Sequence, residues 1–149
     1  MIKVLFVCHG NICRSPMAEF IFKDMIKKRH LENEFYCESC ATSTEEIGND
    51  MYPPAKRKLK EKNIEFTKRK ARQITREDID KFDYIFIMDQ YNIRYLSFLG
   101  LLGSPKIMRL LIYSDHPRDI SDPWYTGDFE ATYQDIVEGE EAFLKHLGY

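Results

Sequence analysis

A cysteine at the end of an apolar run is followed closely by a glycine, an arginine and a serine, a set of residues suited to phosphate chemistry. They lie in the segment Cys8-His9-Gly10-Asn11-Ile12-Cys13-Arg14-Ser15. The planar guanidinium of Arg14 can bind two phosphate oxygens at once, and backbone N–H groups beside a helix N-terminus can converge on an anion. Gly10 and Asn11 tolerate the left-handed backbone that such a loop needs. In this electropositive loop Cys8 is predicted to be a thiolate nucleophile at neutral pH.

A thiolate that attacks phosphorus also needs an acid for the leaving oxygen, and the segment Ser121-Asp122-Pro123-Trp124-Tyr125 offers one. Pro123 stiffens this segment. Trp124 and Tyr125 can wall a pocket and stack on an aromatic leaving group. We therefore predict Asp122 as the general acid. A purely structural interpretation, in which Asp122 only caps a turn before Pro123, stays open.

Alternating strands and helices are expected to position these two segments. The sequence predicts strands at residues 2–7, 34–41, 84–88 and, less strongly, 106–113. Ser15 and Pro16 suit the start of the first helix. Further helical segments are predicted at residues 53–62, 75–78, 89–99 and 128–147. This pattern predicts an α/β fold with a parallel sheet covered by helices on both faces, with the ligand beyond the carboxyl ends of the strands.

Length and composition limit the remaining possibilities. The 149 residues fit one domain, predicted at residues 1–149, and 44% hydrophobic residues exclude a disordered chain. A net charge of −2 argues against a protein that coats nucleic acid or an anionic membrane. The apolar start is too short for a signal peptide and reads as a buried strand. The chain is therefore expected in the cytoplasm, where structural disulfides are uncommon.

Metal binding is not favoured by the cysteines and histidines. Cys37-Glu38-Ser39-Cys40 has the Cys-x-x-Cys spacing, but no second pair and no nearby histidine completes a zinc site. Two buried strand cysteines are the preferred interpretation. Cys13 by itself reads as packing near the start of the first helix.

The segment Val7-Cys8-His9-Gly10-Asn11-Ile12-Cys13-Arg14-Ser15-Pro16-Met17-Ala18-Glu19 closely resembles the signature of the low-molecular-weight protein tyrosine phosphatases. Asp122-Pro123 resembles the general-acid loop of that family. The resemblance also includes Ser39, Gly48, Ala71-Arg72-Gln73 and Met88-Asp89-Gln90-Tyr91-Asn92. It covers nearly the whole chain in the expected order.

The resemblance implies a single-domain, four-stranded parallel sheet flanked by helices, with the phosphate-binding loop after the first strand. It implies that Cys8 attacks the phosphate while Asp122 protonates the leaving phenolate. Asp122 then activates water to hydrolyse the cysteinyl phosphate. No metal and no cofactor is expected, because Arg14 and the loop amides stabilise the charge. The phosphate contacts are expected from His9, Gly10, Asn11, Ile12, Cys13, Arg14 and Ser15.

The resemblance also assigns supporting roles. Asn11 and Ser39 would shape the loop, and Ser15 would assist the departing thiolate. Cys13 would be the partner that traps oxidised Cys8, which makes the site redox-sensitive.

Three positions depart from the family pattern. Glu45 lies near a position that is aromatic in many members, and this acidic wall would repel acidic peptides. Arg69 replaces a histidine found in some members and is expected to neutralise Glu19 or Glu38. Trp124 keeps the aromatic wall where some members have tyrosine. The predicted substrate pocket consists of Ile12, Glu45, Trp124 and Tyr125.

The sequence thus predicts a protein tyrosine phosphatase that acts on phosphotyrosine proteins or aryl phosphates, expected as a monomer without nucleic-acid or membrane partners. An arsenate reductase is disfavoured because no cysteine follows Cys40. A protein-arginine phosphatase typically has threonine at the position of Ile12. A cysteine phosphocarrier needs neither Arg14 nor an acid such as Asp122. A catalytically silent phosphoprotein binder would be expected to lose one of these residues.

Overall fold

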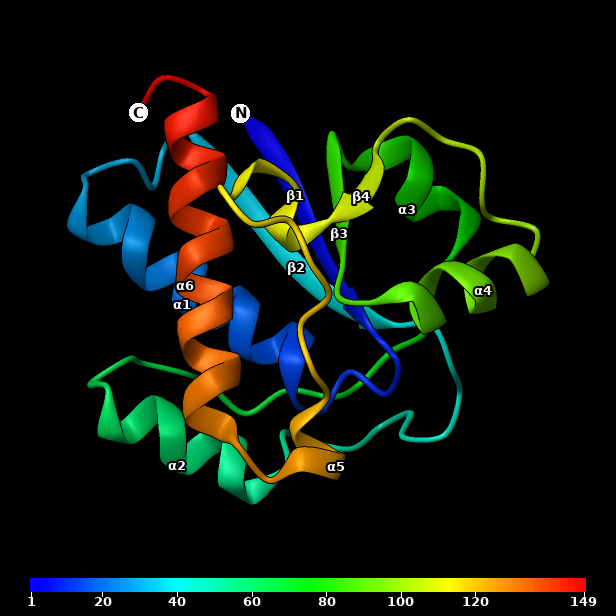
Figure 1. Ribbon diagram of the computed structural model, residues 1–149, viewed down its shortest axis with the longest axis horizontal. Helices are drawn as coiled ribbons and strands as arrows, with labels where there is room; N and C mark the ends of the chain where they lie inside the picture. The colour runs from blue at the N-terminus through cyan, green and yellow to red at the C-terminus, as the bar shows by residue number, and fades with distance from the viewer.

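The computed structural model describes residues 1–149, which form a four-stranded parallel sheet between two layers of helices (Figure 1). The strand order is β2-β1-β3-β4. The strands are β1 (Ile2–Cys8), β2 (Phe35–Ala41), β3 (Tyr84–Ile87) and β4 (Ile107–Arg109). The predicted fold class is therefore confirmed.

The central strand β1 is apolar along its length because both of its faces are covered. Val4, Leu5, Phe6 and Val7 have no exposed surface. A strand buried on both faces reads as a continuous apolar run rather than an alternating one. β1 pairs with β2 on one side and with β3 on the other, so its carboxyl end, at Cys8, emerges in the middle of the sheet edge.

Helices cover both faces of the sheet. They are α1 (Arg14–Lys28), α2 (Pro53–Glu61), α3 (Arg76–Lys81), α4 (Gln90–Phe98), α5 (Pro123–Thr126) and α6 (Phe129–His146), with one 3₁₀ turn, η1 (Leu110–Tyr113). α1 and α6 pack on one face, where Phe6 and Phe143 belong to one apolar cluster. α3 and α4 cover the other face, where Leu5 and Leu96 belong to a second cluster. Figure 1 shows these two layers and both termini at the same end of the sheet. No helix has the length and apolarity needed to cross a membrane.

The starts of α3 and α4 are fixed by side-chain caps, as the sequence indicates. Thr75 accepts a hydrogen bond from the backbone N–H of Asp78 at the start of α3. Asp89 does the same for the N–H of Asn92 at the start of α4. Each cap satisfies an N–H without a partner in the helix and is worth about 1 kcal/mol. Asp89 is thereby held directly beyond β3, at the edge of the sheet where Cys8 lies.

The start of α1 differs from the prediction. The helix begins at Arg14, its N-cap is Cys13, and no side chain caps it. Ser15 is inside the helix, and its hydroxyl lies 3.0 Å from the Cys8 sulfur. A hydroxyl that is held by the loop in this way is not available to cap the helix.

The fourth strand is also shorter than predicted. Regular pairing with β3 ends at Arg109, and the chain then turns so that Leu110 and Leu111 are fully buried. α6 packs closely on this turn through Gly139, where an added Cβ would lie 2.8 Å from the carbonyl oxygen of Leu110. Burial of the two leucines against α6 therefore replaces further strand pairing.

A fully buried carboxyl group on α6 makes stability depend on pH. Both oxygens of Glu140 lack a hydrogen-bond partner, and burial raises the pKa of this carboxyl group well above its ordinary value of 4.5. Because the folded state holds this proton more tightly than the unfolded state, the contribution of Glu140 to stability is greatest below its unfolded pKa and falls as pH rises above it.

We expect Glu140→Gln to unfold at a higher urea concentration than the unmodified protein at pH 7, with a smaller difference at pH 4.5. The difference should grow by up to about 1.4 kcal/mol per pH unit between the two pKa values of Glu140. Urea unfolding at several pH values measures it. Glu32→Gln, at an exposed position, is the matched control. A difference that does not change with pH would contradict the prediction.

Candidate active site

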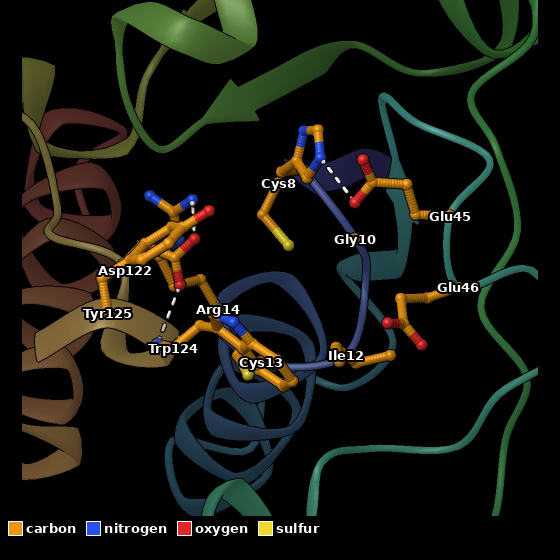
Figure 2. Close-up of a pocket in the computed structure, with 11 residues that line it drawn as sticks. Cys8, Gly10, Ile12, Cys13, Arg14, Glu45, Glu46, Asp122, Trp124 and Tyr125 are labelled. Atoms are coloured by element: carbon orange, nitrogen blue, oxygen red, sulfur yellow. Dashed lines mark hydrogen bonds and ion pairs between the residues drawn. The ribbon is translucent and has the colours of Figure 1, made fainter. Parts of the chain in front are cut away.

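The loop between β1 and α1 forms the floor of a pocket at the carboxyl edge of the sheet (Figure 2). The cavity has a volume of about 140 Å³. Its walls come from three segments that are far apart in the sequence. The lining residues are Cys8, His9, Gly10, Ile12, Cys13, Arg14, Glu45, Glu46, Asp122, Trp124 and Tyr125.

Several hydrogen-bond donors of the loop point toward the sulfur of Cys8. The backbone N–H groups of Asn11 and Ser15 point to it over 3.3 and 3.4 Å. The Ser15 hydroxyl lies 3.0 Å away, and Cys8 itself is only 3% exposed. N–H groups at a helix start favour negative charge, so this arrangement suits a thiolate.

Asn11 holds the loop in its curled form. Its φ of 60° lies in the left-handed region, as predicted, and the residue is fully buried. Its amide nitrogen donates to the hydroxyls of Ser15 and Ser39 over 2.7 and 3.0 Å. Its amide oxygen accepts from the Arg69 guanidinium and from the backbone N–H of Arg72. Because two donors meet this oxygen, the orientation of the amide is fixed, and its nitrogen must face the serines.

Gly10 serves a different purpose from the one predicted. Its φ is not among the positive values, so the left-handed conformation belongs to Asn11 alone in this loop. A Cβ on Gly10 would lie 3.4 Å from the Cγ of Glu46. The glycine therefore permits close approach of the segment after β2.

Arg14 is anchored by acidic groups on two other segments. It is 2% exposed. One guanidinium nitrogen donates to Asp89 over 2.6 Å and to the carbonyl of Ile120 over 2.8 Å. The other lies 3.4 Å from Asp122. Burial lowers the pKa of Arg14, but Cys8 and the two aspartates outweigh it and the net shift is upward. Arg14 thus stays charged and rigidly aimed.

Asp122 caps a helix and also faces the pocket. It is the N-cap of α5, and one carboxylate oxygen accepts from the N–H of Trp124 over 3.0 Å. The second oxygen faces Arg14 in the pocket. The cap therefore fixes the carboxylate and leaves one oxygen available for chemistry.

The aromatic wall faces the loop across the pocket. Trp124 is 52% exposed and Tyr125 is 84% exposed. Tyr52 supports Trp124, with ring centroids 4.7 Å apart. Ile12 lines the floor (Figure 2) and is 9% exposed, so it adds a small apolar surface to the pocket.

A model of the family described as "Low molecular weight phosphotyrosine protein phosphatase" matches residues 3–149. The chain belongs to this family. It is 44% identical to the low molecular weight protein-tyrosine-phosphatase YfkJ of Bacillus subtilis, over 99% of this chain and 96% of the relative. It is 40% identical to the low molecular weight phosphotyrosine protein phosphatase of Sus scrofa, over 97% of this chain and 95% of that protein. The resemblance and the enzyme class predicted from the sequence are thereby confirmed.

Solved structures of phosphatases have the same fold as this chain. The crystal structure of YfkJ from Bacillus subtilis matches with a TM-score of 0.93 at 42% identity, covering 99% of this chain and 95% of that chain. The crystal structure of a Drosophila arginine phosphatase matches with a TM-score of 0.88 at 34% identity, covering 99% of both chains. This phosphatase fold therefore carries more than one substrate class.

Arg69, which departs from the family pattern, makes a contact that the sequence did not reveal. Of the two expected acidic partners, Glu19 or Glu38, Glu38 pairs instead with Arg72 and Lys81. Burial lowers the pKa of Arg69, and Glu19 opposes this shift through its charge. Its guanidinium donates to the side-chain amide oxygen of Asn11 and to the backbone carbonyl oxygen of Asn49, the latter over 3.4 Å. Arg69 therefore acts on the loop through Asn11.

We expect Arg69→Met to slow alkylation of Cys8 at pH 6 by severalfold and to lower kcat, with KM changing less. Without the guanidinium, the Asn11 amide can turn over, and the Ser15 hydroxyl is then less well oriented toward the sulfur. Arg69→Lys should restore part of the rate because it also donates to Asn11. Iodoacetamide kinetics and steady-state rates measure the effect. Equal alkylation rates in Arg69→Met and the unmodified phosphatase would exclude a positioning role.

Acidic groups border the pocket on the side opposite the aromatic wall (Figure 2). Glu45, predicted as a pocket residue, pairs with His9 over 3.0 Å. Glu46, which sequence reasoning missed, accepts from the side chain of Asn49 over 2.6 Å. Its position next to Glu45 in the sequence could have indicated that Glu46 also lines the pocket.

The other cysteines differ in their surroundings. Cys13 lines the pocket and is 5% exposed, and burial followed by the charge of Cys8 raises its pKa. Cys37 and Cys40 are buried in β2, as predicted, but they belong to different apolar clusters. Residues three apart in a strand point to opposite faces, so these two thiols cannot share an ion.

Proposed function

We propose that this phosphatase hydrolyses phosphotyrosine and aryl phosphate monoesters through a cysteinyl phosphate. The convergence of loop N–H groups on the Cys8 sulfur, with Arg14 and Asp122 in the same pocket, carries the proposal. The names of its relatives point the same way.

In the first step Cys8 attacks phosphorus, an S–P bond forms and the bond from phosphorus to the phenolic oxygen breaks. Asp122 gives its proton to that oxygen, so the phenol leaves neutral. Arg14 and the N–H groups of residues 9–15 bind the three equatorial oxygens. Because these donors are already in place, little reorganisation is needed as charge develops.

In the second step Asp122, now a carboxylate, takes a proton from water as the water oxygen attacks phosphorus. The S–P bond breaks, and inorganic phosphate and the Cys8 thiolate are released. The Ser15 hydroxyl stabilises that thiolate from 3.0 Å. The Asn11 amide donates to this hydroxyl and also to the hydroxyl of Ser39, which helps to hold Asn11 in position. Neither step needs a metal or a cofactor.

Ile12 supports phosphotyrosine over phosphoarginine as the substrate. An aliphatic side chain facing aromatic rings favours a phenyl group, whereas a guanidinium keeps N–H groups that need partners. The two substrates must be compared because a structurally similar protein from Drosophila is an arginine phosphatase. Phosphoserine is too short to reach the Cys8 sulfur easily.

The deciding experiment is metal-free turnover of para-nitrophenyl phosphate and of peptides with phosphotyrosine, phosphoserine or phosphoarginine. We expect a strong preference for phosphotyrosine. Ile12→Thr should move the kcat/KM ratio toward phosphoarginine at least roughly tenfold, or about 1.4 kcal/mol. Faster hydrolysis of phosphoarginine by the unmodified enzyme would overturn the substrate assignment.

A cysteine phosphocarrier is the alternative from another functional class. Such a carrier needs no acid for a phenolate and no guanidinium aimed at phosphate, so Arg14 and Asp122 argue for hydrolysis. Repeated release of inorganic phosphate distinguishes the two, because a carrier stops after one phosphate per chain.

Cys13 is proposed as the thiol that traps oxidised Cys8 as a disulfide. Its position in the same pocket supports this role. Its raised pKa keeps Cys13 as a thiol, so closure should be faster at higher pH. Peptide mapping after mild peroxide treatment tests the pairing.

The remaining assignments are also proposals. Residues 1–149 are proposed as one domain, supported by the family match over residues 3–149. A cytoplasmic monomer without nucleic-acid or membrane partners is proposed from the composition. Light scattering and cell fractionation test these two assignments.

A further inference from the structure

A second hollow adjoins the catalytic pocket, and the proposed chemistry does not use it. Its volume is about 620 Å³. It shares His9, Arg14, Asp122 and Tyr125 with the catalytic pocket and extends to Tyr91 and Asp119. The two hollows lie side by side and share these four residues, and Cys8 lines only the catalytic one; we refer to both together as the groove.

On one side of the sulfur, the groove is bordered by Glu45 and Glu46. The Glu45 side chain is 68% exposed, and its only ionic partner is His9. Glu46 is bonded to a neutral amide. Figure 2 shows both carboxylates across the loop from Trp124 and Tyr125. A polypeptide whose phosphotyrosine reaches Cys8 must therefore pass these charges.

On the other side, the groove contains Asp119. One of its oxygens accepts from the N–H of Gln90 over 3.3 Å. The other oxygen is buried, has no hydrogen-bond partner and forms an ion pair with Arg109 over 3.6 Å, while the side chain as a whole is 33% exposed. Tyr91 and Tyr125, which are 71% and 84% exposed, line this part of the groove. Aromatic faces next to a carboxylate suit lysine or arginine side chains.

Apart from Arg14, no lysine or arginine lines either hollow; Asp119 pairs with Arg109, which lies outside the lining, and Glu46 has no ionic partner. Arg14 is held by Asp89 and Asp122 and faces the phosphate site. Arg94 stacks on Tyr91, with its guanidinium 5.3 Å from the ring centroid, and does not line either hollow. The floor of the pocket thus attracts an anion, whereas its borders attract cations.

We propose that the preferred substrates are phosphotyrosine segments with lysine or arginine on both sides of the phosphotyrosine. This inference rests on the proposed function. Glu45 and Glu46 bind the basic residue on one side, and the groove between Asp119 and Tyr91 receives the other. Acidic flanks are rejected by the same carboxylates, since like charges at close range oppose binding.

The test compares three phosphotyrosine peptides that carry lysine, glutamine or glutamate at the two positions on each side. At low ionic strength, kcat/KM should be at least roughly tenfold higher for the lysine peptide than for the glutamate peptide. The ratio should approach one near 1 M salt, where the screening length is about 3 Å. Equal rates for the lysine and glutamate peptides at low salt would overturn the proposal.

Isosteric variants locate the effect. The double variant Glu45→Gln with Glu46→Gln should lower the lysine-to-glutamate ratio of kcat/KM at least threefold. Asp119→Asn should lower the same ratio when it is measured with peptides that carry lysine or glutamate on only one side of the phosphotyrosine. Each ratio is internal to one variant, so changes in basal rate cancel. Glu32→Gln removes an exposed carboxylate from the turn between α1 and β2 and should leave the ratio unchanged. An unchanged ratio in the double variant would also overturn the proposal.

The same assays separate this inference from the proposed function. Turnover of para-nitrophenyl phosphate and of the glutamine peptide without any charge preference would overturn the inference alone. Failure to hydrolyse either of these two substrates would overturn the proposed function, and the inference with it.

Discussion

Cys8→Ser is expected to abolish turnover while phosphate and vanadate still bind. The serine hydroxyl is a much weaker nucleophile at neutral pH, and no group in the pocket is placed to remove its proton, because Asp122 must be protonated to release the phenol. The donors to the anion come from Arg14 and from the backbone, which this change leaves in place. Rate measurements with para-nitrophenyl phosphate and calorimetric titration with phosphate test both parts.

Cys37→Ala is the matched control, since Cys37 is buried in β2 and lies outside the pocket. It should lose some stability through the smaller side chain and keep its kcat. Thermal unfolding shows whether each variant is folded at the assay temperature. Rapid turnover by Cys8→Ser would eliminate the cysteinyl phosphate mechanism.

The sequence predicted the sheet and the phosphate loop because both depend on local patterns. The apolar run of β1 ends at Cys8 and is followed by residues suited to a loop and a helix start. Cap residues such as Thr75 and Asp89 mark helix starts through contacts within one turn. Such signals need no knowledge of the rest of the fold.

What could not be predicted depends on contacts between distant segments. The Arg14–Asp89 ion pair joins the loop after β1 to the loop after β3, and Asp89 already had a sufficient local explanation as a helix cap. Arg69 was expected to neutralise Glu19 or Glu38; Glu19 does act on it through its charge, but its guanidinium donates to the amide oxygen of Asn11 and to the carbonyl of Asn49. The early end of β4 follows from burial against α6. Sequence periodicity does not encode any of these pairings.

Asp122→Asn is expected to lower kcat for phosphotyrosine by about 10²–10⁴, the usual contribution of a positioned proton donor. The asparagine side-chain oxygen can still accept from the Trp124 N–H and cap α5, so the loop should keep its shape. What is lost is the acidic proton, since the side-chain amide cannot protonate a phenolate. The fold should therefore be retained, and thermal unfolding checks this.

The size of the loss should depend on the leaving group, because a phenolate that is already stable needs less protonation. With para-nitrophenyl phosphate the loss of kcat should be smaller than with phosphotyrosine, and with more activated phenols smaller still. Asp115→Asn, at an exposed position outside the pocket, is the matched control and should keep its kcat on every substrate. A series of substituted phenyl phosphates, assayed for both variants and the unmodified phosphatase, gives the slope of log kcat against leaving-group acidity. An equal loss for Asp122→Asn across the series would show that Asp122 does not donate the proton.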